Sequence, residues 1–154
     1  MIENKINILT SYGVEKNIFD KYDILFLPEN IESTPSAEKL YTTLESTNLC
    51  KIFKESNLSC ANSYDLNLEA NHLDRRSHDL WLGVIWIMNN VTLPFFISLF
   101  IDWLKAKLSK GSHVIHMDLT INKKSLFTQI KYVGEGETLI KILNSLKDDN
   151  DTTN

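Results

Sequence analysis

The densest group of side chains that could do chemistry runs from His72 to Asp79, in the order HLDRRSHD. The adjacent guanidinium groups of Arg75 and Arg76 have the geometry to bind a carboxylate or phosphate through paired hydrogen bonds. His78 beside Asp79 has the residue types of a general acid–base pair. The same residue types also occur at the solvated start of an ordinary helix. The sequence therefore leaves a helix start and a partner-binding edge as the two main interpretations, and it disfavours catalysis.

A second candidate group lies later in the chain, where His116 and Asp118 occupy alternate positions and His113 precedes them. Imidazole and carboxylate groups are common metal ligands, but a metal site needs three or four of them. No further ligand is placed beside these residues by the sequence pattern. Cys50 and Cys60 form neither a disulfide framework nor a nucleophile with an oriented base. We therefore expect no metal, no cofactor and no catalytic residue, and hence a protein that is not an enzyme.

The elements that must position these groups are organised around an apolar run over 80–101, which holds 22 residues without a formal charge. A helix of that length would reach about 33 Å, enough to cross the roughly 30 Å hydrocarbon core of a bilayer. However, Asn89 and Asn90 lie at its middle, and Pro94 removes a backbone donor. The run is therefore predicted to break into two hydrophobic helices, about 76–89 and about 93–108.

Two helices that are apolar on every side need complete burial. A chain of 154 residues is expected to surround one such helix but not two. We therefore predict a protein-interaction or adaptor subunit that binds a second copy or another protein through these helices, with membrane association of 80–101 as the alternative. A compact monomer with both helices in its core is also left open. The predicted interface residues are Arg75, Arg76, Trp81, Trp86, Phe95, Phe96, Phe100 and Trp103.

Composition indicates one domain over 1–147, with 43% hydrophobic residues and a net charge of −4. Residues 1–71 carry six basic and eleven acidic side chains, whereas residues 72–147 carry ten basic and six acidic ones. The basic residues are scattered, which disfavours nucleic acid as the partner. No signal-peptide pattern follows Met1, so we expect a cytoplasmic protein, or an inner-membrane-associated one in the membrane alternative.

The first 71 residues predict a short βα unit. An apolar stretch from Asp23 to Leu27, closed by Pro28, is typical of a buried strand. A helix is expected to begin at Thr34–Pro35 and to end near Ser56. Residues 58–68 predict a second strand or an extended arm. No glycine-rich turn follows the first strand, so a nucleotide-binding version of this unit is not indicated.

The C-terminal part predicts a β-hairpin followed by a helix. Residues 114–121 alternate between apolar and polar side chains, as a half-buried strand does. A turn at 122–124 leads to a partner strand over 126–133 and then to a helix over 137–147. Together with the preceding elements this gives an α+β fold, a C-terminal ββα part over 111–147, and a disordered acidic tail over 148–154.

The order of elements from 93 to 147 is helix, Gly111, strand, strand, helix. This pattern resembles the small effector-associated modules, a helix plus ββα, that accompany peptidases and other effectors in bacterial conflict systems. The resemblance covers about a third of the chain and contains no invariant motif. It implies an adaptor or a regulated partner within a multiprotein defence-type assembly, with no catalytic residues to carry over.

Overall fold

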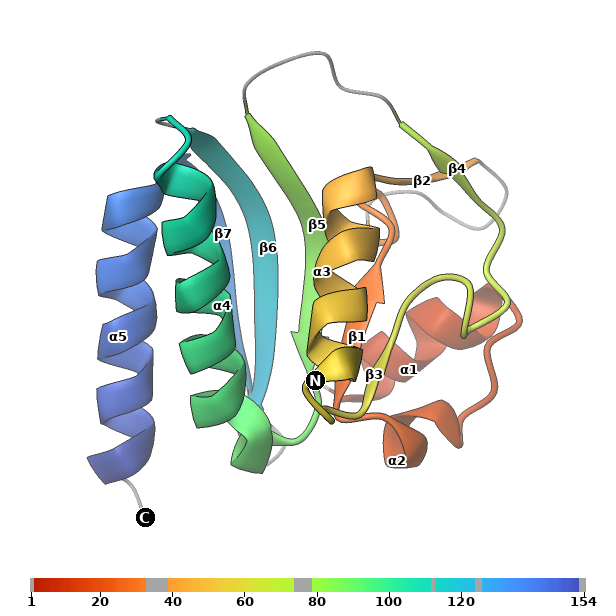
Figure 1. Cartoon of the computed structure of the whole chain (residues 1–154). Coiled ribbons are helices and arrows are strands. Elements are labelled where there is room, and N and C mark those ends of the chain that lie inside the picture. The colour runs from red at the N-terminus through yellow and green to blue at the C-terminus, as the bar shows by residue number, and fades with distance from the viewer. Residues whose placement is uncertain (1, 33–38, 74–78, 112, 124–125, 153–154) are drawn as a thin grey trace.

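The computed structural model describes residues 2–32, 39–73, 79–111, 113–123 and 126–152. Its centre is a mixed five-stranded sheet in the order β3-β1-β5-β6-β7, with helices packed on both faces (Figure 1). The α+β class is therefore confirmed. The strands of this sheet are β1 (Ile24–Leu27), β3 (Cys60–Ala61), β5 (Leu80–Ile87), β6 (Val114–Lys123) and β7 (Leu126–Glu135).

The predicted N-terminal strand is β1, in which all four residues are buried. Ile24 and Phe26 face one hydrophobic cluster, and Leu25 and Leu27 face the other. Burial on both sides explains why the strand is apolar at every position. β1 runs parallel to β3, and helix α3 (Leu44–Glu55) lies between them in the chain, preceded by a further short strand. β3 covers only two residues of the strand predicted over 58–68, and residues 63–67 form a turn instead.

Helix α3 (Leu44–Glu55) begins nine residues later than predicted. The expected start at Thr34–Pro35 lies outside the described residues. Leu40–Thr42 instead forms strand β2, which pairs in parallel with β4 (Ala70–His72) in a small second sheet. Thr43 ends this strand in an extended conformation, and its side-chain oxygen accepts a hydrogen bond from the Ser46 N–H at 3.3 Å. A capping threonine therefore sets the helix start.

The prediction of a helix over 76–89 is wrong, because residues 80–87 form β5 between β1 and β6. A central strand is covered on both faces, so it has the nearly continuous apolar sequence that was interpreted as a buried helix. Its second half, Val84 to Ile87, is rich in β-branched residues, which favour strands. The strand length of eight residues is also ordinary for a sheet.

A bulge in β5 disrupts the alternation that would have identified it as a strand. The register with β6 shifts between Trp81 and Gly83, and Gly83 has φ +70. As a result, Leu82 and Ile85 both contribute to the same hydrophobic cluster although they are three positions apart. A Cβ at Gly83 would lie 3.2 Å from the Leu27 carbonyl oxygen. Glycine is therefore required both for the left-handed backbone and for the close approach of β1.

The second predicted helix is confirmed as α4 (Leu93–Leu108), which follows the 3-10 turn η1 (Asn90–Thr92). Pro94 lies in its first turn, where the missing N–H has no helical acceptor in any case. One face of α4 packs on the sheet and is buried. That face consists of Leu93, Phe96, Ile97, Phe100, Ile101 and Leu104.

The predicted C-terminal hairpin and helix are confirmed as β6, β7 and α5 (Gly136–Thr152). Ile115, Met117, Leu119 and Ile121 face the helices, as the alternating pattern predicts. α5 packs beside α4 (Figure 1) and continues five residues past its predicted end, so residues 148–152 of the expected disordered tail are helical.

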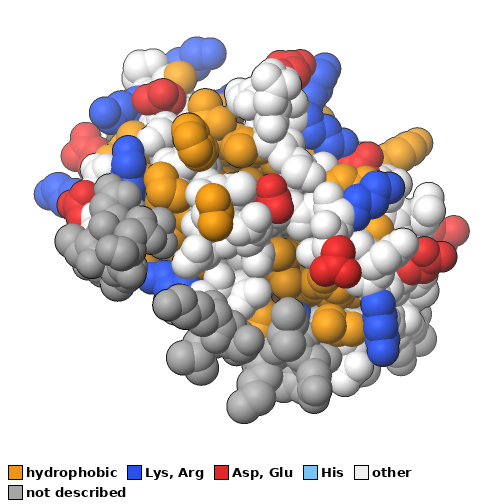
Figure 2. Space-filling model, turned by 90° about the horizontal axis from the view of Figure 1, so that it is seen from below, with side chains coloured by type: hydrophobic (Ala, Val, Ile, Leu, Met, Phe, Trp, Pro, Cys, Tyr) orange, Lys and Arg blue, Asp and Glu red, His pale blue; other side chains and the backbone are white. Residues whose placement is uncertain are grey.

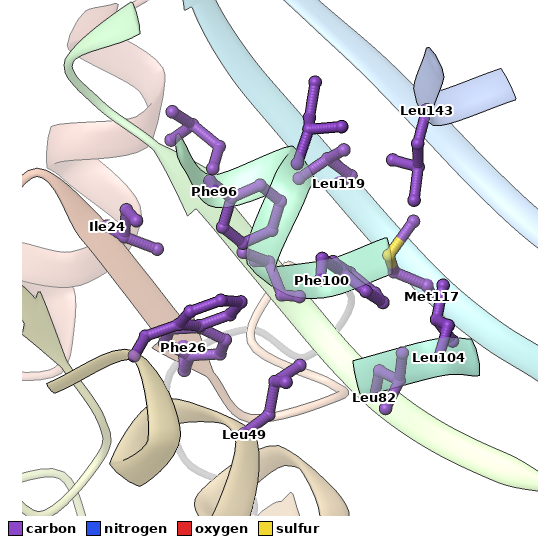
Figure 3. Packing of buried hydrophobic residues seen from close by; sticks show 14 of the residues in the cluster. Ile24, Phe26, Leu49, Leu82, Phe96, Phe100, Leu104, Met117, Leu119 and Leu143 are labelled. Atoms are coloured by element: carbon purple, nitrogen blue, oxygen red, sulfur yellow. The ribbon is translucent and has the colours of Figure 1, made fainter. Parts of the chain in front are cut away.

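The sheet separates two hydrophobic clusters. α3, α4 and α5 cover one face and enclose the larger cluster, which includes Phe26, Phe96 and Phe100 (Figure 3). The helix α1 (Ile2–Ser11) lies against the other face, and α2 (Ile18–Lys21) follows it (Figure 1). The chain therefore buries most of its apolar run by itself. The premise that two central helices exceed what the chain can cover is wrong.

Candidate functional site

Three of the predicted interface residues are in the core. Trp86 is fully buried in the cluster beneath α1, because it belongs to the central strand. Phe96 and Phe100 are fully buried because they lie on the face of α4 that packs on the sheet. None of the three can contact a partner in this fold. Arg75 and Arg76 lie outside the described residues.

The outer face of α4 carries the other predicted aromatic residues. Phe95 is 68% exposed, and Val91, one turn earlier in η1, is 76% exposed. Leu99 and Trp103 continue the same spacing of four residues and are half-buried. Both pack against the core along one side. We call these four residues the α4 ridge.

The α4 ridge begins at one end of the molecule and becomes basic toward the other. Figure 2 views the molecule from the end where α4 begins and shows hydrophobic side chains gathered there among polar and charged ones. Near the other end, Lys107 places its Nζ 5.5 Å from the ring centroid of Trp103. Lys105 and Lys110 are exposed, and Asp102 is the only acidic residue of the helix. The ridge is thus apolar at its start and positively charged at its end.

Trp81, the remaining predicted residue, lies in a different place, on the sheet face opposite the helices α4 and α5. Its indole stacks on the imidazole of His116 with ring centroids 3.5 Å apart and an interplanar angle of 6°. Asp79 Oδ2 lies 2.9 Å from His116 Nε2. We call Asp79, Trp81 and His116 the His116 cluster. Parallel pairing of β5 with β6 produces it, because Trp81 and His116 are register partners.

A second polar network adjoins this cluster. Gln129 donates to Asp118 Oδ1 at 3.0 Å and to Glu32 Oε2 at 3.1 Å. Lys5 forms an ion pair with Glu32 and lies 4.9 Å from the ring centroid of Trp86. Burial raises the pKa of Asp118, whereas the hydrogen bond from Gln129 opposes that shift. The network therefore ties α1 and β7 across this face of the sheet.

The described residues around His116 do not include the nucleophile of a hydrolytic site. A shallow hollow of about 220 Å³ is lined by Glu29, Gly83 and Asp118 together with Trp81 and His116. Asp79 orients the imidazole as a carboxylate orients a catalytic base. However, none of the described residues that line the hollow is a serine, threonine or cysteine.

His113, His116 and Asp118 are the possible metal ligands that the sequence offers. Within the described residues, no group of three or more His, Cys, Asp or Glu side chains has the geometry to hold a metal ion. Asp118 is instead bonded to Gln129, and His116 to Asp79.

The two cysteines are free thiols in the core between α3 and β3. Burial raises the pKa of both Cys50 and Cys60 to about 12. The thiolate is the nucleophilic form, so neither residue is poised to react at neutral pH.

The membrane alternative assigned 80–101 to a bilayer. These residues form β5, η1 and the first half of α4. Across the described ranges, none of the helices combines the length and the hydropathy needed to span a membrane.

Four residues of these surfaces were not predicted from the sequence. Val91 and Leu99 complete the α4 ridge, and their four-residue spacing with Phe95 and Trp103 is visible in the sequence. Glu29 and Gln129 reach their sites only through the fold, and no local sequence signal identifies them.

Comparison with known proteins finds no match to this chain among family models, curated proteins or solved structures.

Proposed function

We propose that this domain is a non-catalytic protein-interaction module that binds an amphipathic helix of a partner protein along the α4 ridge. The observation that carries the proposal is the exposure of Phe95 in α4 and of Val91 in the preceding turn η1, while the inner face of α4 is already used by the core. Residues spaced by four form a ridge that packs into the groove of another helix.

The positive charge at the end of the α4 ridge determines which kind of partner helix it can bind. Lys105 and Lys107 flank the end of the ridge, and Lys110 follows it. A partner helix with acidic residues at that end would gain complementary contacts, which favour encounter and register. Two copies of α4 would not complement each other, because a parallel pair brings lysines together and an antiparallel pair sets them against the apolar start. A second protein therefore fits this surface better than a second copy of the chain.

We also propose a cellular compartment and a type of assembly for this function. The two free, buried thiols suit a reducing compartment, so we place the protein in the cytoplasm. The order of α4, β6, β7 and α5 supports an adaptor role within a bacterial defence-type assembly only through its resemblance to effector-associated modules.

The test uses a photo-crosslinking amino acid at position 95 in cells that carry the gene naturally. We expect one partner protein to be crosslinked from position 95 but not from position 133, because Val133 is equally exposed, at 69%, on a different surface. The purified partner should then bind the wild-type chain, and Phe95→Asp should weaken that binding at least about tenfold. Val133→Asp is the matched control and should bind as the wild type does.

The fold should tolerate Phe95→Asp, since the side chain is exposed and an acidic residue in the first turn of α4 suits the helix dipole. Replacing Lys105 and Lys107 by glutamate should slow association and reduce its salt dependence. Equal binding by Phe95→Asp and the wild type would refute the proposal. A wild-type dimer that Phe95→Asp converts to a monomer in sedimentation would show that a second copy occupies the ridge, which also contradicts it.

A further inference from the structure

A cavity of about 440 Å³ lies between the first turn of α3 and the chain that leads from β3 to β4. Its volume falls within the roughly 300–1,000 Å³ range of small-molecule sites. Thr42 and Ser46 line it from the start of α3, and Ser63, Tyr64 and Asn71 line it from the other side. The pairing of β2 with β4 brings these two segments together. The cavity does not include the α4 ridge or the His116 cluster.

Buried hydroxyl groups are concentrated at this cavity. Five polar side chains are buried in the described part of the chain, and three of them, Thr42, Ser46 and Ser63, line the cavity. Ser63 is only 8% exposed, and its hydroxyl has no hydrogen-bond partner among the described residues. A buried hydroxyl without a partner is unfavourable in the folded chain. In this structure the Ser63 hydroxyl is closed off from water, and a rotation about χ1 to another staggered position would be needed to bring it to a ligand in the cavity.

Tyr64 provides an aromatic surface at the rim of the cavity. Its side chain is 89% exposed although it is a large, partly apolar group. The loop that holds it is well tied: Asp65 N donates to Asn62 Oδ1 at 3.1 Å, and Asn62 N donates to Asp65 Oδ2 at 2.9 Å. Lys54 of α3 forms an ion pair with Asp65. The tyrosine ring is thus presented on a fixed loop, as a stacking platform for a flat ligand would be.

Charge around the cavity argues against an anionic ligand. None of the described residues that line it is a lysine or arginine, whereas the carboxylate of Glu69 does line it. The positive end of α3 already has the acidic Glu45 in its first turn. A phosphate group would therefore meet more negative than positive charge.

We propose that this cavity binds an uncharged, ring-bearing small molecule with several hydroxyl or amide groups, such as a nucleoside or a monosaccharide. The ring would stack on Tyr64, and the polar groups would bond to Ser63 and Asn71. This site is independent of the protein-binding function proposed for the α4 ridge.

The experiment measures binding to the full chain by ligand-observed NMR and calorimetry. The probes are adenosine, guanosine, cytidine and uridine, then glucose, galactose and mannose, each beside its monophosphate. We expect one of the two classes to bind, and its uncharged form to bind more tightly than its phosphate. Binding by nucleosides or by sugars distinguishes the two sources of the ring. No binding by any of the seven uncharged probes at about 10 mM, or tighter binding of the phosphates, would overturn the proposal.

Two variants connect binding to the cavity. Tyr64→Ala should weaken binding about tenfold, whereas Tyr64→Phe should keep most of it, because stacking needs the ring and not the hydroxyl. Ser63→Ala should also weaken binding about tenfold, yet leave the melting temperature of the ligand-free chain unchanged or higher, since it removes an unpartnered hydroxyl. Ser145→Ala, on α5, is the control and should bind normally. A lower melting temperature for Ser63→Ala with unchanged binding would assign the hydroxyl a structural role and contradict the proposal.

Discussion

Alkaline pH should destabilise this protein through its two buried thiols. Cys50 lies on α3 and Cys60 on β3, and both belong to the larger hydrophobic cluster. Burial raises the pKa of each thiol from an ordinary value of 9.0 to about 12. Lys54 opposes the shift but does not cancel it. In the unfolded chain the same thiols are in water and ionise near their ordinary pKa.

The direction in which stability changes with pH follows from proton binding. Because the folded-state pKa is the higher one, the stabilisation is fully present below pH 9 and is lost as the pH rises toward 12. At about pH 10 an unfolded thiol is roughly nine-tenths ionised while the folded one keeps its proton, so each thiol lowers the free energy of unfolding by on the order of 1 kcal/mol. Cys50 and Cys60 together should remove roughly 2–3 kcal/mol, a large share of the roughly 5–15 kcal/mol of a typical domain.

The assay is urea unfolding of the wild type and of Cys50→Ala/Cys60→Ala at about pH 7.5 and pH 10. Lysines and tyrosines titrate in both proteins, so they cancel in the difference between them. That difference should shift by roughly 2–3 kcal/mol between the two pH values, and by about half as much for either single variant. A difference that stays constant with pH would mean that the thiols are not held protonated in the folded state, and the reasoning about this part of the core would be wrong.

Three further outcomes follow from the packing and the backbone. Trp86→Ala should lower the free energy of unfolding by about 3–5 kcal/mol and Phe95→Ala by no more than about 0.5 kcal/mol in urea titrations; similar losses would contradict their assignment to core and surface. Gly83→Ala should cost about 1–3 kcal/mol because of its left-handed φ and the nearby carbonyl oxygen of β1. Gly13→Ala, at φ +88 in open space, should cost less, and equal losses would show that the contact with β1 is unimportant. Burial raises the pKa of Asp118 above 3.8, so the wild type loses stability relative to Asp118→Asn as the pH rises above the ordinary pKa of a carboxyl group; a flat difference between the two would contradict this.

The sequence was most informative where one face of an element is buried and the other is not. The alternation in β6 identifies both the strand and its inward side chains, Ile115 to Ile121, because a half-covered strand must alternate. α4 was predictable for a related reason: Asn90 and Pro94 mark its start, and its polar residues gather at its end. In both elements the polar residues on the exposed side identify the element and its orientation.

β5 was not predictable because it has little exposed side. It lies between two strands and beneath covered faces, so six of its eight residues are buried and polar markers are lacking. The bulge before Gly83 then shifts the alternation by one residue. An apolar run with a broken period of two has the appearance of a helix. The assignment of this strand to a helix produced the expectation of two incompletely buried helices. It also placed Trp86 on a binding surface.

The two proposed sites differ in what the sequence could have revealed. The α4 ridge is periodic: Val91, Phe95, Leu99 and Trp103 recur every four residues, beside the apolar stripe that supplies the core. Its first two members, Val91 and Phe95, are exposed, and this additional apolar spacing can be found in the sequence once the helix start is known. The cavity beside α3 has no such period. Its hydroxyl groups come from segments about twenty residues apart that only the pairing of β2 with β4 brings together. Side chains that are unremarkable one by one become a site through their burial, and burial is a property of the fold.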